Sequence, residues 1–280
     1  MITKVEVFGV HRAPTLSLGG FMPSDDPVHI RNIDGLGPVK AEITTTPSGT
    51  SRGETKQGSS VGKRNIVMTL GYNPNWAGGQ TISSLRKLLY GYFMTQQWVK
   101  LRFYSDDMPT VDIEGTVEDT VTNHFAQDPE VQVSIICERP DFVEIDASIY
   151  KGVVDDGSNQ LEVDYQGSVS SGLEIRIDRS VDLPAYSGFV MITVDNFEGR
   201  KTITVDSATI DTTKSFKMSS IPSQKRVQLE ALVDGAITNL LKVKSGDWPS
   251  LQPGENLISV RAGEPGQSWT LAFFNRYGGL

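Results

Sequence analysis

Paired carboxylates are the side chains in this sequence whose type and spacing come closest to catalytic chemistry. Two aspartates stand side by side at three places, Asp25-Asp26, Asp106-Asp107 and Asp155-Asp156. A glycosidase holds two such groups across the bond that it cleaves. Each pair here lies in a turn-like stretch, where an aspartate commonly bonds its own backbone. We therefore predict no catalytic role for these pairs.

Metal and nucleotide chemistry also find little support in the sequence. The three histidines, His11, His29 and His124, are far apart, whereas metal ligands usually come in closely spaced pairs. Gly62-Lys63 is followed by Arg64 where a phosphate-binding loop needs Ser or Thr, and the position five before Gly62 is not glycine. We predict a protein that is not an enzyme and has no metal site or cofactor.

The four tryptophans are candidates for core packing, for an interface or for binding a sugar. Trp98 and Trp269 begin predicted strands and are expected in the core, whereas Trp76 fits either packing under a helix or an interface. Trp248 opens GDWPSLQPGENLISV, where it is either a stacking platform for a sugar or the corner that closes a β-sandwich. Pro253-Gly254 fits a type II turn, and an alternating strand follows, which favours the corner.

Length, charge and apolar content favour a folded chain of two domains. The chain has 280 residues, of which 38% are hydrophobic and 21% charged. Its net charge is −8, with 13 Lys and Arg against 18 Asp and Glu in residues 1–150 and 13 against 16 in residues 151–280. Neither half has the positive field that duplex DNA or anionic lipid requires. Without a signal-peptide pattern or a run of about 18 apolar residues, we expect a soluble protein made in a cytoplasm, with no membrane partner.

Most of the first half is predicted to be β-strand. Alternation or β-branched residues mark five stretches between turn residues: Val39–Thr46, Asn65–Tyr72, Val99–Ser105, Val111–Thr120 and Val131–Cys137. Cys137 is the only cysteine, so it allows no intramolecular disulfide, and its apolar surroundings predict a buried thiol.

One segment, Thr81–Gln96, has helical periodicity. Its apolar residues recur at helical spacing and should pack on the surrounding sheet. Thr81 or a following serine can cap its start, and Gly91 weakens its last turn.

A long polar connection, Thr44–Lys63, separates the first two predicted strands. Its cations Arg52, Lys56 and Lys63, with the adjacent Arg64, outnumber its one carboxylate. About 20 residues without an apolar period are unusual inside a compact domain. The segment is either a mobile hairpin tip or a stretch that a partner or neighbouring subunit orders.

The chain is predicted to divide near residue 145, into domains 1–145 and 146–280. Pro140 ends the first set of strands. Beyond it, turns fall roughly every 8–12 residues between strand-like stretches such as LLKVKS (Leu240–Ser245). Hairpin turns are predicted at Asp195–Lys201 and Val233–Ala236. These features predict a mainly β protein whose second half is an antiparallel β-sandwich.

Short motifs follow one another in a particular order along the chain. IRNIDGLGP and a polar hairpin precede KRNIVMTLGY, the helix ISSLRKLLYGYF, VKLRFYSDD, VDIEGTVED and VQVSIICERPDF. The strand-only half then ends in WPSLQPGENLISV and FNRYGGL. This ordered set, which covers almost the whole chain, resembles the distal tail protein (Dit) family of long-tailed, siphovirus-type bacteriophages.

The resemblance implies a structural virion protein assembled in the bacterial host cytoplasm. It implies an N-terminal ring-forming domain with one helix and a galectin-like C-terminal β-sandwich. Six copies would form a ring at the distal end of the tail, between the tail-tube protein and the tip or hub protein. Receptor-binding or fibre proteins join the outer domain in some phages, and DNA only passes through the channel. The alternative is a carbohydrate-binding protein that uses its sandwich to attach to host glycans, because fold does not fix function.

A closed ring built by one repeated contact needs two complementary patches on each subunit. The polar hairpin is basic, and the stretch 106–119 has six carboxylates and no Lys or Arg. The candidate interface therefore consists of Arg52, Lys56, Lys63, Arg64, Asp106, Asp107, Asp112 and Glu114. The alternative is that both are simply solvated faces.

Overall fold

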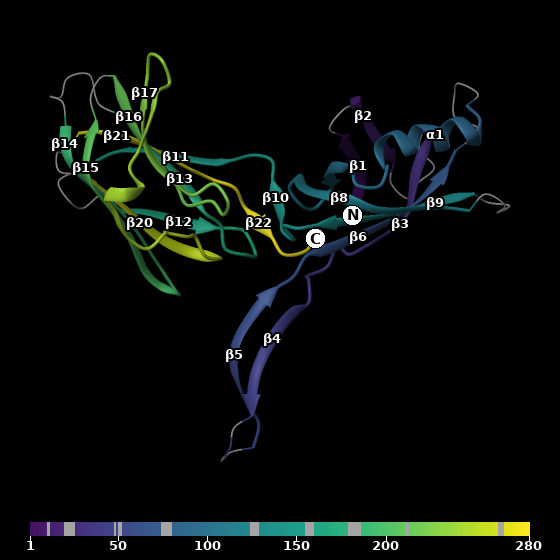
Figure 1. Cartoon of the computed structure of the whole chain (residues 1–280), viewed down its shortest axis with the longest axis horizontal. Coiled ribbons are helices and arrows are strands. Elements are labelled where there is room, and N and C mark those ends of the chain that lie inside the picture. The colour runs from purple at the N-terminus through teal and green to yellow at the C-terminus, as the bar shows by residue number, and fades with distance from the viewer. Residues whose placement is uncertain are drawn as a thin grey trace. The chain divides into compact units, whose positions relative to one another are not determined.

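The structure is a computed structural model that describes residues 1–9, 12–19, 26–47, 49, 52–73, 80–123, 129–154, 160–178, 186–210, 213–262 and 266–280. Of the residues considered above, His11, Asp25, Trp76, His124 and the pair at 155–156 lie outside these ranges. The described chain is mainly β, as predicted, and forms two compact units (Figure 1). The first comprises Met1–Ile145 with Tyr277–Leu280, and the second Asp146–Arg276.

The first unit is built on a closed barrel of seven strands. The strands follow the order β8-β7-β1-β2-β3-β6-β9, and β9 pairs back onto β8. Two further strands, β10 and β22, extend the sheet from β8. The bounds are β1 Ile2–Gly9, β2 Arg12–Gly19, β3 Val28–Asp34, β6 Arg64–Tyr72, β7 Trp98–Ser105, β8 Val111–Thr122, β9 Glu130–Cys137, β10 Phe142–Glu144 and β22 Arg276–Tyr277.

Alternation along β7 shows how the sequence fills this barrel. Val99, Leu101 and Phe103 are buried, so the residues between them face outward. Trp98 belongs to the outward set and is 38% exposed. The prediction that Trp98 is a core residue was therefore wrong, because the parity of its strand places it with Lys100 and Arg102.

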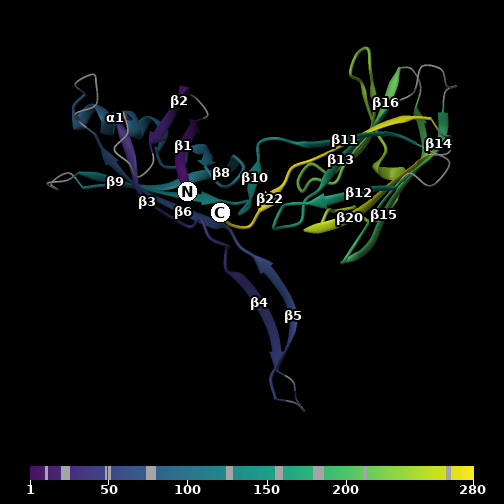
Figure 2. The same cartoon turned by 180° about the vertical axis from the view of Figure 1, so that it is seen from behind.

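Helix α1 (Ile82–Tyr92) lies beside β1 and β2 (Figures 1 and 2). Leu85, Leu89 and Tyr92 join the core of the barrel, which confirms the predicted packing of its apolar face. The Thr81 hydroxyl accepts a hydrogen bond from the Ser84 backbone N–H at 3.2 Å, as expected of an N-cap. The helix ends one residue after Gly91, four residues before the predicted end.

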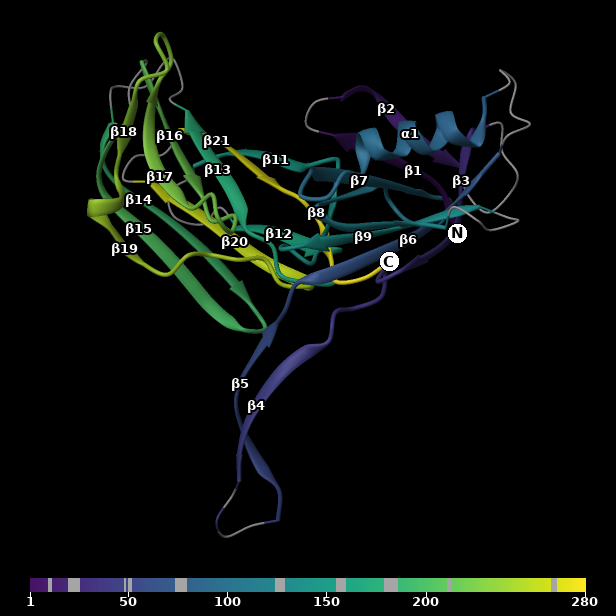
Figure 3. The same cartoon turned by 45° about the vertical axis from the view of Figure 1, so that its right-hand side comes forward.

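The polar connection forms a two-stranded β-hairpin (Figure 3). Its strands, β4 (Ala41–Pro47) and β5 (Glu54–Val61), pair with each other from Ala41–Val61 to Pro47–Glu54. Almost every residue in both strands is exposed. The predicted strand Val39–Thr46 is confirmed by β4, whereas β5 was not predicted. Neither face of the ribbon is buried, so no apolar period marks β5.

The second unit is an antiparallel β-sandwich, as predicted. One sheet has the order β11-β21-β13-β16-β17-β18 and the other β12-β20-β14-β15-β19, and side chains from both form one core. The bounds are β11 Ser148–Val153, β12 Gln160–Tyr165, β13 Leu173–Asp178, β14 Tyr186–Asn196, β15 Gly199–Ile210, β16 Lys214–Ser219, β17 Arg226–Ala231, β18 Ile237–Asn239, β19 Lys244–Gly246, β20 Gly254–Ala262 and β21 Ser268–Phe273.

Two details of the second half differ from the expectation. LLKVKS is not one strand: a 3₁₀ turn, η1 (Leu241–Val243), precedes the short strand β19. The last four residues, Tyr277–Leu280, belong to the first unit and not to domain 146–280. The Leu280 N–H donates to Leu36 O at 3.0 Å, a long-range contact that the local sequence does not reveal.

Candidate functional site

Arg64, predicted to lie in an exposed basic patch, is buried inside the first unit and is 2% exposed. Its guanidinium donates to four backbone carbonyls: Nε to Pro140 (2.6 Å), Nη1 to Gly35 (2.5 Å) and Gly37 (2.6 Å), and Nη2 to Gly278 (2.5 Å). Burial lowers the pKa of Arg64, an effect that nearby Cys137 and Asp141 oppose. Arg64 is therefore removed from the candidate interface, because strand β6 begins there and turns its side chain inward.

The remaining cations of the hairpin match the prediction better. Arg52, Lys56 and Lys63 are exposed, and none has an ion-pair partner within the described part of the chain. The carboxylates of Asp106 and Glu114 are exposed as well, and that of Asp106 acts electrostatically on the amino group of Met1. The structure does not bring the two sets together within one chain, since β4 and β5 pair only with each other among the described strands.

Two of the predicted acidic residues have partners within the same unit. Asp112 accepts from Arg102 Nε at 2.7 Å and Nη2 at 3.0 Å, and Lys100 Nζ lies 3.3 Å from it. The Asp107 carboxylate lies 2.8 Å from the amino group of Met1, which lowers the pKa of Asp107 to about 2. The free charge of the acidic stretch is therefore smaller than its composition suggests.

Trp248 packs against the core of the sandwich, as the corner interpretation of GDWPSLQPGENLISV predicts. Lys225 Nζ and Lys244 Nζ lie 5.7 Å and 5.0 Å from its ring centroid. Cation–π contacts thus occupy the ring, and a sugar would have to displace them to stack there. Gly254 has φ +87°, as the second central residue of a type II turn requires.

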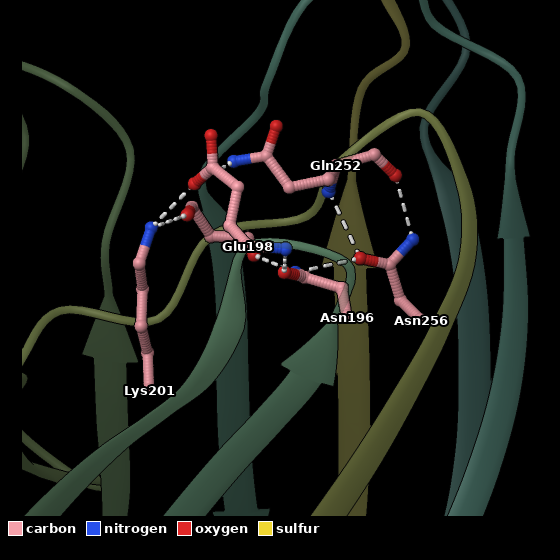
Figure 4. A network of polar contacts seen from close by, with 6 residues as sticks. Asn196, Glu198, Lys201, Gln252 and Asn256 are labelled. Carbon is pink, nitrogen blue, oxygen red and sulfur yellow. Dashed lines mark hydrogen bonds and ion pairs between the residues drawn. The ribbon is translucent and has the colours of Figure 1, made fainter.

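A polar network fixes this corner to the turn between β14 and β15 (Figure 4). The buried Asn256 donates to Gln252 O (2.7 Å) and accepts from the Gln252 N–H (2.9 Å) and from Asn196 Nδ2 (3.1 Å). Gln252 Nε2 donates to Glu198 at 2.7 Å, and Lys201 binds the same carboxylate at 3.0 Å. These bonds satisfy the polar groups that the corner buries, so the turn is held by several partners.

Next to this corner is an open groove of about 930 Å³. Its lining combines carboxylates and amides with the ring of Phe197, which is 75% exposed at the β14–β15 turn. The lining includes Glu162, Asp164, Asp195, Asn196, Phe197 and Glu255. Sequence reasoning did not single out this groove, because its residues come from three strands that only the sandwich brings together.

Other catalytic possibilities do not gain support from the geometry. Gly58-Ser59-Ser60-Val61-Gly62 has the spacing of a nucleophile elbow, but Ser60 lies within strand β5 and not on a strand-to-helix turn. Cys137 is buried, as predicted, and burial raises the pKa of its thiol to about 11. Within the described ranges, no group of three or more His, Cys, Asp or Glu side chains could hold a metal ion. No described helix is long and apolar enough to cross a membrane.

The comparison with known proteins rests on structure. No family model and no curated protein matches the sequence. The chain superimposes on the crystal structure of the Dit (gp 19.1) protein of phage SPP1, described as a paradigm of the hub adsorption apparatus in phages that infect Gram-positive hosts. The TM-score is 0.66 and the identity 16%, over 97% of this chain and 98% of that chain. A chain of the phage P2 baseplate in its activated conformation with Ca matches with a TM-score of 0.50 and 9% identity, over the full length of both chains. The protein therefore has the fold of a phage distal tail (Dit) protein, as the order of its sequence motifs predicted.

Proposed function

We propose that this protein is a structural component of a phage virion, a ring-forming adaptor at the distal end of the tail. It would join the tail-tube protein to the tip or hub and its receptor-binding apparatus, without enzymatic activity. The observation that carries the proposal is the end-to-end match with SPP1 Dit, which spans both the barrel and the sandwich of this chain and almost the whole of that chain. Two unrelated domains are seldom joined in the same order by chance, so the match supports a shared role.

In this proposal the first unit builds the ring and the sandwich faces the partners. One repeated contact can close such a ring only if each subunit carries two complementary patches. The exposed cations Arg52, Lys56 and Lys63 on the hairpin provide one patch. The exposed carboxylates of Asp106 and Glu114 on the neighbouring subunit are the proposed counterpart.

Mass photometry of the purified full-length chain tests the ring. Six copies of the 30.7 kDa chain form a particle of about 184 kDa, and negative-stain images would show an annulus. Charge reversal of Arg52, Lys56 and Lys63 to glutamate should dissociate the particle at moderate salt, where exposed ion pairs are only partly screened. The matched control reverses Lys151, Lys242 and Arg261 in the sandwich, which changes the net charge equally. A monomeric wild-type chain would contradict the ring, and an intact particle in the hairpin variant would contradict the patches.

The groove beside Phe197 favours the second candidate function, attachment to host glycans. An exposed aromatic face can stack on the apolar face of a sugar, and carboxylates and amides accept or donate bonds to hydroxyls. A glycan array probed with the wild-type chain and with Phe197→Ala distinguishes the two functions. Binding that is lost in Phe197→Ala would support carbohydrate recognition.

A further inference from the structure

Arg64 connects segments that lie far apart in the sequence. Its acceptors come from the stretch before β4, from the turn after β9 and from the C-terminal segment. Arg64 itself begins β6, and only two residues separate it from the end of β5. Both roots of the β4–β5 hairpin therefore meet the C-terminal segment at one guanidinium. These are the stretches IDGLGP, KRN, ERPDF and RYGGL, whose order along the chain marked the Dit resemblance.

The C-terminal segment also contacts the root of the hairpin directly. The Leu280 N–H donates to Leu36 O at 3.0 Å. A Cβ atom on Gly279 would lie only 2.8 Å from Pro38 N and 2.9 Å from Pro38 Cδ, so this backbone approach requires glycine. The last residues therefore lie against the stretch that leads into β4.

The chemistry of the site requires arginine. Four carbonyls, with no carboxylate among them, take four of the five N–H bonds that a guanidinium offers, and its carbon lies 4.6 Å from the centroid of the Phe142 ring. A lysine ammonium has only three donors and no planar fork, so it could not reach all four acceptors. The position of Gly35, one of the four acceptors, requires glycine. Its φ is +87°, and a Cβ atom there would lie 2.0 Å from Asn65 O.

The hairpin has no core of its own that could fix its direction. Nearly all of its residues are exposed, and an isolated two-stranded ribbon is marginally stable in water. Its order therefore depends on its roots. We infer that Arg64 is a positioning residue that couples the β4–β5 hairpin to the C-terminal segment, so that docking of Tyr277–Leu280 holds the hairpin in place for a partner. Only this last consequence, presentation to a neighbouring subunit, rests on the proposed function.

Hydrogen–deuterium exchange of the full-length chain tests the coupling through Gly279→Ala. This variant forces the C-terminal segment away from Pro38 without altering Arg64 or the hairpin. We expect exchange in peptides covering β4 and β5 to accelerate about tenfold or more, the factor implied by losing one charge-assisted hydrogen bond. Peptides from β7 and β13 should be unchanged. Gly62→Ala is the matched control at the base of the hairpin, since its added methyl group would meet no atom within 4 Å and Gly62 is not an acceptor of Arg64. Acceleration confined to residues 277–280 would overturn the inference.

Arg64→Lys provides the second variant, because it keeps the charge and loses the fork. Faster exchange in both the hairpin and the C-terminal segment is the expected signature, whereas unchanged exchange in either one would overturn the coupling. If this variant fails to fold, Gly279→Ala still decides the matter. Mass photometry of the same samples distinguishes a failure of the proposed function from a failure of the coupling through Arg64. A wild-type chain without a ring refutes the proposed function, while the exchange data alone decide the coupling.

Discussion

Lys63 and Arg64 are neighbours in the sequence with opposite environments. Lys63 is exposed at the base of the hairpin, whereas the side chain of Arg64 is enclosed by backbone carbonyls and the Phe142 ring. Residue type alone predicts two exposed cations, because a fully buried arginine is uncommon. The difference arises from strand parity, since β6 begins at Arg64 and directs alternate side chains into the barrel. Counting the charged residues of a segment therefore overestimates how many of these charges are exposed on the surface.

At the residue scale, Trp248→Ala should destabilise the full-length chain. Its ring packs on the sandwich core and is only partly buried, so we expect a loss of about 1–2 kcal/mol, below the roughly 3–5 kcal/mol for a fully buried tryptophan. Urea unfolding measures the change. Phe197→Ala is the control, because that ring is exposed and its removal should alter stability by less than about 0.5 kcal/mol. Unchanged stability in Trp248→Ala, together with lost sugar binding, would restore the stacking-platform interpretation.

At the element scale, barrel closure depends on how tightly β8 meets β9. The two strands pair from Thr116–Ile136 to Thr122–Val131, with a shift of register between Val117 and Asp119. This pairing turns an open sheet into a closed barrel and removes two exposed edges. By contrast, β4 and β5 keep their outer edges, and their polar, charged side chains suit a ribbon that is exposed to water.

Gly115→Ala should weaken this closure. A Cβ atom there would lie 2.7 Å from Ile136 O, 2.8 Å from Ile135 Cγ2 and 2.9 Å from Cys137 Sγ, so β8 and β9 would have to separate. We expect a loss of about 1–3 kcal/mol, the usual range for overpacking, in chemical unfolding. Gly58→Ala is the matched strand control in β5, where no atom lies within 4 Å of the added methyl group. Equal effects of the two substitutions would show that close approach is not the cause.

At the scale of the whole molecule, two separate cores stabilise the chain. Buried residues of the barrel, with α1, form one cluster, and buried residues of both sandwich sheets form the other. The chain enters the second unit after Ile145 and returns to the first at Tyr277. A break near residue 145 follows from Pro140 and the turn-rich stretch after it, but the return of the last four residues depends on the acceptors that they meet.

Calorimetry of the full-length chain should therefore resolve two unfolding transitions. Leu101→Ala removes a buried side chain from the barrel. It should reduce the free energy of unfolding for only one transition, by roughly 2–5 kcal/mol. Leu271→Ala removes a buried side chain from the sandwich and should reduce the free energy of unfolding for only the other transition, by a similar amount. A single transition that both substitutions shift together would contradict independent units.

The features that repeat locally could be predicted from the sequence. Alternation or β-branched residues predicted β4, β6, β7, β8 and β9, and the 3.6-residue period predicted α1 with its Thr81 cap. Turn chemistry predicted two hairpins of the sandwich, β14–β15 and β17–β18. The same signal was present in β1, where Val5 and Val7 alternate with Lys4 and Glu6, although no strand was predicted there. The order of the motifs also predicted the Dit fold.

Which faces are buried and which distant segments meet depends instead on long-range packing. It placed Trp98 outside the barrel, formed the second strand of the polar hairpin, β5, and brought four motifs of the chain together around Arg64. It also formed the groove beside Phe197 from three strands of the sandwich. The physical reason is that periodicity and turn propensity act over a few residues. A guanidinium that binds carbonyls more than 200 residues away along the chain, like that of Arg64 on Gly278, depends on long-range packing that no local pattern records.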